Sequence, residues 1–328
     1  MLAAPATYRP TTSPQRLNAK RDGYVERTVT TDDGVQLAVR DYAATGTRRH
    51  TVVLLHGLCL TQDSWAAQIG ELRSRWGNSV RVVTYDHRGH GSSGGAGMHT
   101  YRIERLAADL AEVLTALEVA GPMTVAGHSM GGMTALAYLG RPAADRPVDP
   151  HGLVLVATAA GKIAERGIGR FLATPATGIL FGLIDRMPRR ATDQAVHALA
   201  KPLSAALSRY PGTGAQRSAL AAVAAVAVRT TSMSTAAGFL PSLKRYDEYD
   251  TLASIAANTV VLSGGADMLT PADHARDLAA AIPGATHLHI PTAGHMLLQD
   301  ASHSVSTAIN RVMSTDSSPA PQLASSAS

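Results

Sequence analysis

The segment of residues 122–132, PMTVAGHSMGG, constrains the fold of this chain more than any other. An apolar run ends there in Gly127-His128-Ser129-Met130-Gly131, and a helix-compatible sequence follows at once. We therefore predict a strand, a sharp turn and a helix. The middle residue of such a turn adopts strained backbone geometry, and glycines two positions away on either side let strand and helix pass close together. Ser129 is then left pointing outward at the end of the strand.

Further short apolar runs predict the rest of a sheet. They are continuous rather than alternating, which is typical of strands buried on both faces of a parallel sheet. The segments between them have helical periodicity, most clearly in residues 103–117. We predict an α/β fold, a doubly wound and mostly parallel sheet, in which functional groups collect at the carboxyl ends of the strands. The predicted strands are residues 51–55, 80–85, 123–126, 153–156, 259–262 and 287–290.

The two ends of the chain and its first strands differ from this pattern. Residues 25–31 and 35–42 alternate and are separated by Asp32-Asp33-Gly34, which predicts an antiparallel hairpin at one edge of the sheet. Residues 1–22 and 314–328 are rich in Pro, Ser, Thr and Ala without periodicity, and we expect both to be disordered. The α/β core is then divided between residues 23–160 and 249–313.

Residues 161–248 interrupt the alternation of strand and helix, and we interpret them as an inserted helical cap. Two strongly apolar pieces, residues 178–184 and 219–228, either pack the cap or line a pocket for a hydrophobic substrate. Residues 161–246 hold twelve Lys/Arg and three Asp/Glu, a net charge of +9 in a chain of +5. This basic segment is either a solvated surface or a surface for peripheral contact with an anionic membrane. No nucleic-acid-binding signature accompanies it, so we expect no nucleic-acid partner.

Composition places few further limits on the chain. Of 328 residues, 45% are hydrophobic, which suits a large α/β domain with an insertion. The single cysteine, Cys59, excludes an intrachain disulfide and fits a reducing compartment, so we expect a cytoplasmic location with membrane association as an option. We find no signal peptide and no apolar run of about 18 residues that would span a membrane. Oligomeric state is not readable from the sequence.

A serine hydroxyl needs a neighbouring base, normally a histidine held by a carboxylate, before it acts as a nucleophile. Both partners follow later in the chain. Asp267 lies in the loop after the predicted strand at 259–262, and His295 lies in the loop after the strand at 287–290. No acidic residue directly follows the strand at 153–156, which favours Asp267 as the acid. We predict Ser129, Asp267 and His295 as the catalytic residues.

This order and placement resemble the α/β-hydrolase superfamily over about residues 25–312. His56-Gly57 resembles the oxyanion-loop motif of that superfamily, and residues 86–93, DHRGHGSS, resemble its D-x-R-G-x-G-x-S turn. The N–H of Met130, next to the nucleophile and at a helix start, is one expected donor to an oxyanion. The resemblance implies that Leu58 supplies the second. The supporting loop residues are His56, Gly57, Gly127 and Gly131.

The predicted activity is that of a cofactor-free, metal-free serine hydrolase acting on a small-molecule carboxylic ester, lipid-like or otherwise hydrophobic. The motifs are similar to those of esterases and monoacylglycerol-lipase-like enzymes. A C–C bond hydrolase and a cofactor-free perhydrolase of the same fold stay open, as does a non-catalytic ligand receptor or scaffold. We interpret Cys59 as a packing residue. Four histidines are expected to shape loops by hydrogen bonding rather than to carry protons: His56, His87, His90 and His128.

Overall fold

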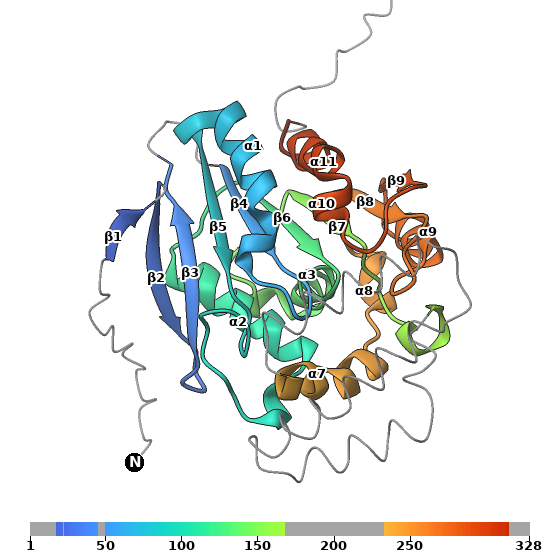
Figure 1. Cartoon of the computed structure of the whole chain (residues 1–328), viewed down its shortest axis with the longest axis horizontal. Coiled ribbons are helices and arrows are strands. Elements are labelled where there is room, and N and C mark those ends of the chain that lie inside the picture. The colour runs from blue at the N-terminus through green and yellow to red at the C-terminus, as the bar shows by residue number, and fades with distance from the viewer. Residues whose placement is uncertain (1–17, 22, 45–49, 168–232, 315–328) are drawn as a thin grey trace, which may run out of the picture.

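The computed structural model of the chain describes residues 18–21, 23–44, 50–167 and 233–314 (Figure 1). They form a nine-stranded sheet in the order β1-β2-β3-β5-β4-β6-β7-β8-β9. Neighbouring strands from β5 through β9 are parallel, whereas the β1–β2, β2–β3 and β3–β5 pairs are antiparallel. The predicted doubly wound, mostly parallel sheet is confirmed. Its strands are β1 Asn18–Arg21, β2 Tyr24–Thr30, β3 Gln36–Tyr42, β4 His50–Leu55, β5 Val80–Tyr85, β6 Met123–His128, β7 Gly152–Val156, β8 Asn258–Gly264 and β9 Thr286–Ile290.

Strand β4 shows why the central strands are continuous apolar runs. It lies between β5 and β6, and every one of its residues is buried. Val52 and Leu54 pack into the core on one face of the sheet, and Val53 and Leu55 pack into the core on the other. Successive side chains of a strand point to opposite faces, so a strand covered on both sides has no solvent-exposed position.

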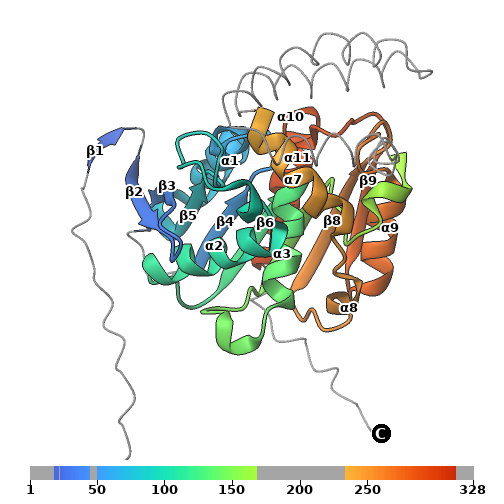
Figure 2. The ribbon, with the colours of Figure 1, turned by 90° about the horizontal axis from the view of Figure 1, so that it is seen from below.

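Helices cover both faces of the sheet (Figures 1 and 2). One face carries α1 Ala66–Trp76, α10 Leu297–Asp300 and α11 Ser302–Ser314; the other carries α2 Ile103–Ala116, α3 Met130–Gly140, α7 Met233–Arg245, α8 Tyr249–Leu252 and α9 Ala272–Ala281. None of the helices in these described segments is both long and apolar enough to cross a bilayer.

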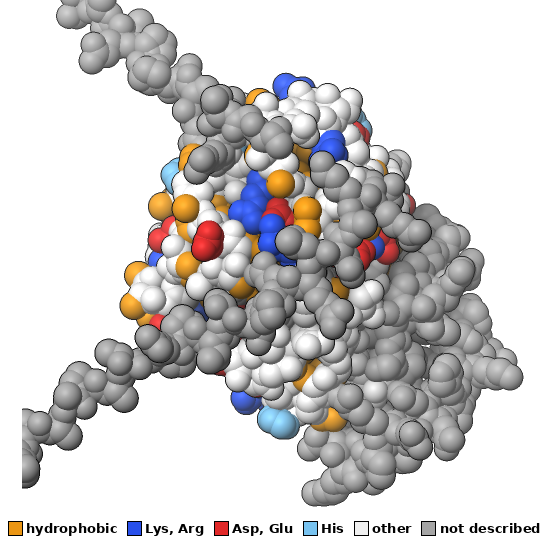
Figure 3. Space-filling model, turned by 90° about the vertical axis from the view of Figure 1, so that its left-hand side faces the viewer, with side chains coloured by type: hydrophobic (Ala, Val, Ile, Leu, Met, Phe, Trp, Pro, Cys, Tyr) orange, Lys and Arg blue, Asp and Glu red, His pale blue; other side chains and the backbone are white. Residues whose placement is uncertain are grey.

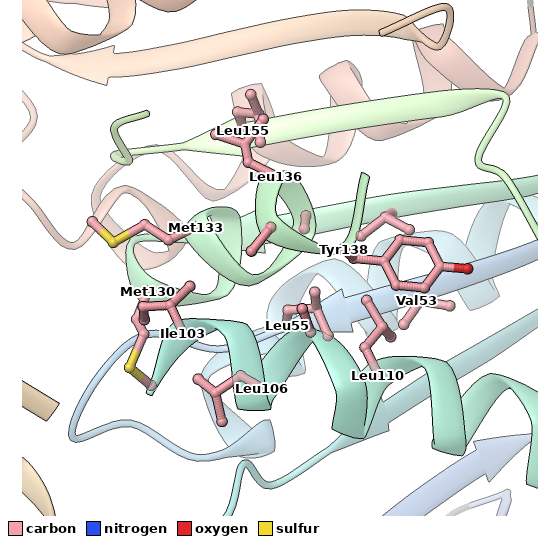
Figure 4. Close-up of a cluster of buried hydrophobic side chains, with 14 of the residues drawn as sticks. Val53, Leu55, Ile103, Leu106, Leu110, Met130, Met133, Leu136, Tyr138 and Leu155 are labelled. Atoms are coloured by element: carbon pink, nitrogen blue, oxygen red, sulfur yellow. The ribbon is translucent and has the colours of Figure 1, made fainter. Parts of the chain in front are cut away.

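Helix α2 confirms the helical periodicity read from residues 103–117. Its Ile103, Leu106 and Leu110 repeat at intervals of three and four and are fully buried. Figure 4 shows Ile103 beside Met130 of α3 and Leu110 beside Val53 of β4. The apolar stripe of α2 is therefore used against both the sheet and the neighbouring helix.

Two expectations about the edges of the sheet are wrong. Residues 18–21 were expected to be part of a disordered segment, but they form β1, whose Asn18 pairs with Glu26 of β2. This pairing gives partners to backbone groups that an exposed β2 edge would leave open. Strand β9 was expected to be buried on both faces, yet Leu288 is 40% exposed. The sheet ends at β9, so its side chains are less enclosed than those of the central strands.

The predicted cap is described only at its two ends. Residues 168–232, which hold both apolar pieces, lie outside the described residues. The ends meet at the core: the Glu248 N–H donates to the Ala160 carbonyl at 2.7 Å, and Gly161 and Asp247 form an isolated β-bridge. Helix α7 lies within the predicted cap but packs into the core, where Phe239 is fully buried.

Arg88 joins three separate segments. Its guanidinium is fully buried and donates two hydrogen bonds of 2.7 Å to Asp109 of α2. It also donates to Asp33 in the hairpin turn at 2.7 and 3.0 Å, and these bonds hold the pKa of Asp33 below its usual value. The loop after β5 is thereby tied to the hairpin and to α2.

Charge pairing is also visible on the surface of the first strands. Figure 3 shows Lys/Arg and Asp/Glu side chains next to one another on this face. Arg27 pairs with Asp41 within the hairpin, and Arg40 of the hairpin pairs with Asp63, which lies between β4 and α1. The Asp63 carboxylate is exposed, and an exposed pair of this kind contributes little to stability, in contrast to the buried Arg88.

Replacing Arg88 by Met should lower the free energy of unfolding by about 3–5 kcal/mol, because Asp109 would be left as a buried charge that has lost its principal partner. Denaturant unfolding of the purified protein measures this change. The control is Arg276→Met, which removes an exposed ion pair with Asp273 and should change stability by no more than about 0.5 kcal/mol. Equal effects of the two substitutions would contradict a structural role for Arg88.

Candidate active site

Ser129 sits in a strained turn between β6 and α3. Its φ of 52° is in a region that non-glycine residues rarely adopt. A Cβ on Gly131 would lie 2.2 Å from the Leu55 carbonyl oxygen, and one on Gly127 would lie 2.5 Å from the Gly131 carbonyl. The predicted turn is confirmed, and the two glycines are required because backbone fills the space that a side chain would need.

The structure brings Ser129, His295 and Asp267 together. His295 Nε2 lies 3.0 Å from Ser129 Oγ, and His295 Nδ1 lies 2.8 Å from Asp267 Oδ2. Ser129 follows β6, Asp267 follows β8 and His295 follows β9. These strands run parallel in one sheet. Their carboxyl ends therefore meet at one edge, where residues separated by 166 positions come within hydrogen-bond distance.

The Asp267 carboxylate is held by more donors than His295 alone. Its Oδ1 accepts from the backbone N–H groups of Leu269 and Thr270 at 2.9 and 3.0 Å, and its Oδ2 accepts from Thr270 Oγ1 at 2.8 Å. Burial alone would raise the pKa of Asp267, but the neighbouring His295 and these hydrogen bonds outweigh it, so the pKa is lowered. An ionised Asp267 assigns the proton of His295 to Nδ1 and leaves a lone pair on Nε2 facing Ser129.

Thr270 was missed in the sequence. An aspartate that accepts from the N–H groups two and three residues later forms a common turn, and this Asp-x-x-Thr spacing is the signal that could have revealed it. The bond of the Thr270 hydroxyl depends on the path of the loop, which the spacing alone does not give.

The two expected backbone donors lie at the same place. Met130 is the first residue of α3, and Leu58 follows Gly57 in the loop after β4. A Cβ on Gly57 would lie 3.2 Å from Ser129 Cβ, so this loop passes directly beside the serine. Within the described part of the chain, neither the Leu58 nor the Met130 backbone N–H has an acceptor. Both groups are thus available to an anionic oxygen near Ser129.

The neighbouring histidines form hydrogen bonds between loops, as expected. His128 Nε2 lies 2.8 Å from the His295 carbonyl oxygen and so anchors the backbone of that residue. His56 and His87 are each bonded to the backbone of the other. Burial lowers the pKa of His56 to about 4 and those of His90 and His128 to about 3, so the rings are neutral near pH 7.

Cys59 lies beside this group of histidines and is half-buried. Burial raises the pKa of its thiol to about 12, so the thiolate that a nucleophile requires is scarce. In the segments that the structure describes, no three His, Cys, Asp or Glu side chains are grouped so as to hold a metal ion.

A comparison of sequences identifies the family. The sequence model of the alpha/beta hydrolase fold matches residues 50–301, well over half of the chain. The chain belongs to the α/β-hydrolase family. This hydrolase is 30% identical over 249 residues to a Klebsiella pneumoniae (strain 342) protein named "Putative carbamate hydrolase RutD", and the match covers 74% of the hydrolase and 84% of the relative.

Solved structures agree with this assignment. The hydrolase superposes on the enol-lactonase from Burkholderia xenovorans LB400 with a TM-score of 0.65 and 25% identity, covering 88% of this chain and 99% of the enol-lactonase. It superposes on a thermophilic esterase from Thermogutta terrifontis with a TM-score of 0.64 and 25% identity, covering 89% of this chain and 98% of the esterase.

Replacing Gly131 by Ala should lower the free energy of unfolding of the hydrolase by about 1–3 kcal/mol, because the added methyl group meets the Leu55 carbonyl. The matched control is Gly70→Ala in α1, where no atom lies within 4 Å of the new Cβ. It should stabilise by about 0.5–1 kcal/mol through the helix preference of alanine. Thermal or denaturant unfolding measures both. A neutral Gly131→Ala would contradict the close approach of α3 to β4.

Proposed function

We propose that the hydrolase cleaves carboxylic esters through an acyl-enzyme on Ser129. Ser129 is the nucleophile, His295 the general base and acid, and Asp267 the residue that orients His295. The observation that carries this proposal is the pair of contacts of His295, 3.0 Å to Ser129 Oγ and 2.8 Å to Asp267 Oδ2. Such a chain of hydrogen bonds is what a serine needs to lose its proton as it attacks.

Acylation begins when Ser129 Oγ attacks the acyl carbon and its proton passes to His295 Nε2. The carbonyl oxygen of the substrate becomes negatively charged in the tetrahedral intermediate, and the N–H groups of Leu58 and Met130 donate to it. His295 then gives its proton to the leaving alcohol oxygen as the carbon–oxygen bond breaks. Asp267 stabilises the imidazolium that exists between these two proton transfers.

Deacylation repeats these steps with water. His295 takes a proton from water as the water oxygen attacks the acyl carbon, and the same two N–H groups hold the second oxyanion. When the acyl–oxygen bond breaks, Ser129 Oγ recovers its proton from His295 and the acid is released. In enzymes of this type, loss of one oxyanion donor costs about 10²–10³ in kcat.

The substrate class is proposed from the sequence of the predicted cap and from a relative. We assign a hydrophobic ester, because the predicted cap carries the two apolar segments at residues 178–184 and 219–228. A carbamate is a second candidate, because the Klebsiella pneumoniae relative is named for that bond and matches 74% of this chain. Its carbonyl would be attacked in the same way, so Ser129 and His295 keep their roles.

Replacing Ser129 by Ala should lower kcat for p-nitrophenyl esters by about 10⁴ or more, because no oxygen nucleophile remains. Turnover and covalent labelling by a fluorophosphonate probe are measured for both proteins. Turnover that survives Ser129→Ala unchanged would exclude the acyl-enzyme. The same assay is run with p-nitrophenyl esters from short to long acyl chain and with p-nitrophenyl carbamates. A higher kcat/KM for the carbamates than for every ester would reject the ester assignment.

Replacing Thr270 by Val should lower kcat about three- to tenfold, because Asp267 loses one charged hydrogen bond but keeps the N–H groups of Leu269 and Thr270. KM should change little. Thr270→Ser keeps the hydroxyl and serves as the control. Equal kcat values for the valine and serine variants would show that the hydroxyl does not contribute to the orientation of Asp267 and His295.

A further inference from the structure

The peptide group before Leu58 is held from the side opposite the proposed oxyanion. His56 Nδ1 lies 2.8 Å from the Gly57 carbonyl oxygen, and the Leu60 N–H donates to the same oxygen at 3.1 Å. In a trans peptide the N–H points away from the carbonyl. The two bonds to the Gly57 carbonyl therefore orient the Leu58 N–H from one side of the residue.

The peptide group after Leu58 is held by His90. The Cys59 N–H donates to His90 Nε2 at 3.1 Å. His90 Nδ1 lies 3.1 Å from the Arg88 carbonyl oxygen, which accepts only from a protonated nitrogen. This pairing assigns the ring proton to Nδ1 and leaves Nε2 as the acceptor. His90 thus connects the loop after β5 to the loop after β4.

The hydrogen bond to His90 acts on a strained residue. Cys59 has a φ of 60°, which costs a residue with a side chain more than it costs glycine. A backbone N–H in such a conformation needs a fixed acceptor to stay in place. Removing the acceptor would let Cys59 relax, and the backbone of Leu58 would then be held from the Gly57 side alone.

The surroundings of His90 keep it neutral and immobile. The residue is fully buried, and burial together with His56 lowers the pKa of His90 to about 3. Phe239 of α7 packs against its ring at a centroid distance of 5.8 Å. Helix α7 also contacts the preceding turn, where a Cβ on Gly89 would lie 2.6 Å from Thr235 Cγ2. His90 therefore lies between α7 and the loop that contains Leu58.

We infer that His90 is a positioning residue of the proposed oxyanion hole, holding Cys59, and through it the Leu58 N–H, in the orientation that a tetrahedral intermediate requires. The inference rests on the proposed serine-hydrolase function. His90 also links α7 to this loop, because Phe239 of α7 packs against the imidazole and the imidazole accepts from Cys59. His90 itself touches neither the substrate nor Ser129.

Three variants separate the acceptor from the bulk of the ring. His90→Phe keeps a ring against Phe239 but has no acceptor. His90→Asn keeps a donor for the Arg88 carbonyl but does not reach the Cys59 N–H. His90→Gln places an amide oxygen near the position of Nε2. Ester hydrolysis is measured as kcat and KM, together with inhibition by an arylboronic acid, which forms a tetrahedral adduct on serine.

We expect His90→Phe and His90→Asn to lower kcat about tenfold and to change KM by no more than about twofold. An oxyanion donor contributes a factor of about 10²–10³ to kcat, and a displaced donor loses part of that factor. Boronic-acid affinity should fall by a similar factor, and His90→Gln should recover most of both losses. If His90 had only a structural role, boronic-acid affinity and substrate KM would change by the same factor. If His90→Phe fails to fold, His90→Asn and His90→Gln carry the comparison.

Unchanged kcat and boronic-acid affinity in the folded variants would overturn this role of His90. Equal losses in His90→Asn and His90→Gln would also overturn it, because an acceptor would then make no difference. Failure of the proposed function is distinguished by Ser129→Ala. If that variant kept full ester turnover, the acyl-enzyme itself would be rejected, whatever the behaviour of the His90 variants.

Discussion

The close approach of helix α3 to the sheet is the constraint on which the site depends. Backbone atoms of α3 occupy the space beside Gly127 and those of β4 the space beside Gly131, so this turn forms only where both side chains are absent. The same approach forces Ser129 to a φ of 52° and places the Met130 N–H at the start of the helix. Strain in the turn, a projecting hydroxyl and an unpaired donor are thus three results of one packing arrangement.

The parallel order of the sheet supplies the partners of that turn. Loops after β4, β6, β8 and β9 emerge at one edge, so each contributes a different group: a backbone donor, a hydroxyl, a carboxylate and an imidazole. Loops carry many backbone polar groups, and burying them is costly unless they are paired. Here neutral buried imidazoles do much of this pairing, as in the bonds of His90 to Cys59 and Arg88 and of His128 to His295.

Much of this could be predicted because local patterns carry the information. Continuous apolar runs gave the central strands, spacing of three and four gave α2, and residues placed just beyond strand ends gave Ser129, Asp267 and His295. The errors concern segments whose burial or pairing depends on neighbouring strands rather than on their own sequence. The sequence of residues 287–290 does not show that β9 is the last strand of the sheet. The polar sequence of residues 18–21 does not show that these residues pair with the outer edge of β2.

The sequence by itself determined the turn at Ser129, the order of Ser129, Asp267 and His295 beyond their strands, and the class of fold, because glycine spacing and strand periodicity act over a few residues. Tertiary structure alone decided which side chains hold those groups in place. His90 accepts from Cys59 across 31 positions, and His128 bonds to the His295 carbonyl, only because the loops meet at one edge of the sheet. Hydrogen bonds of this kind depend on distances of a few tenths of an ångström between distant segments, and no residue pattern within either segment encodes them.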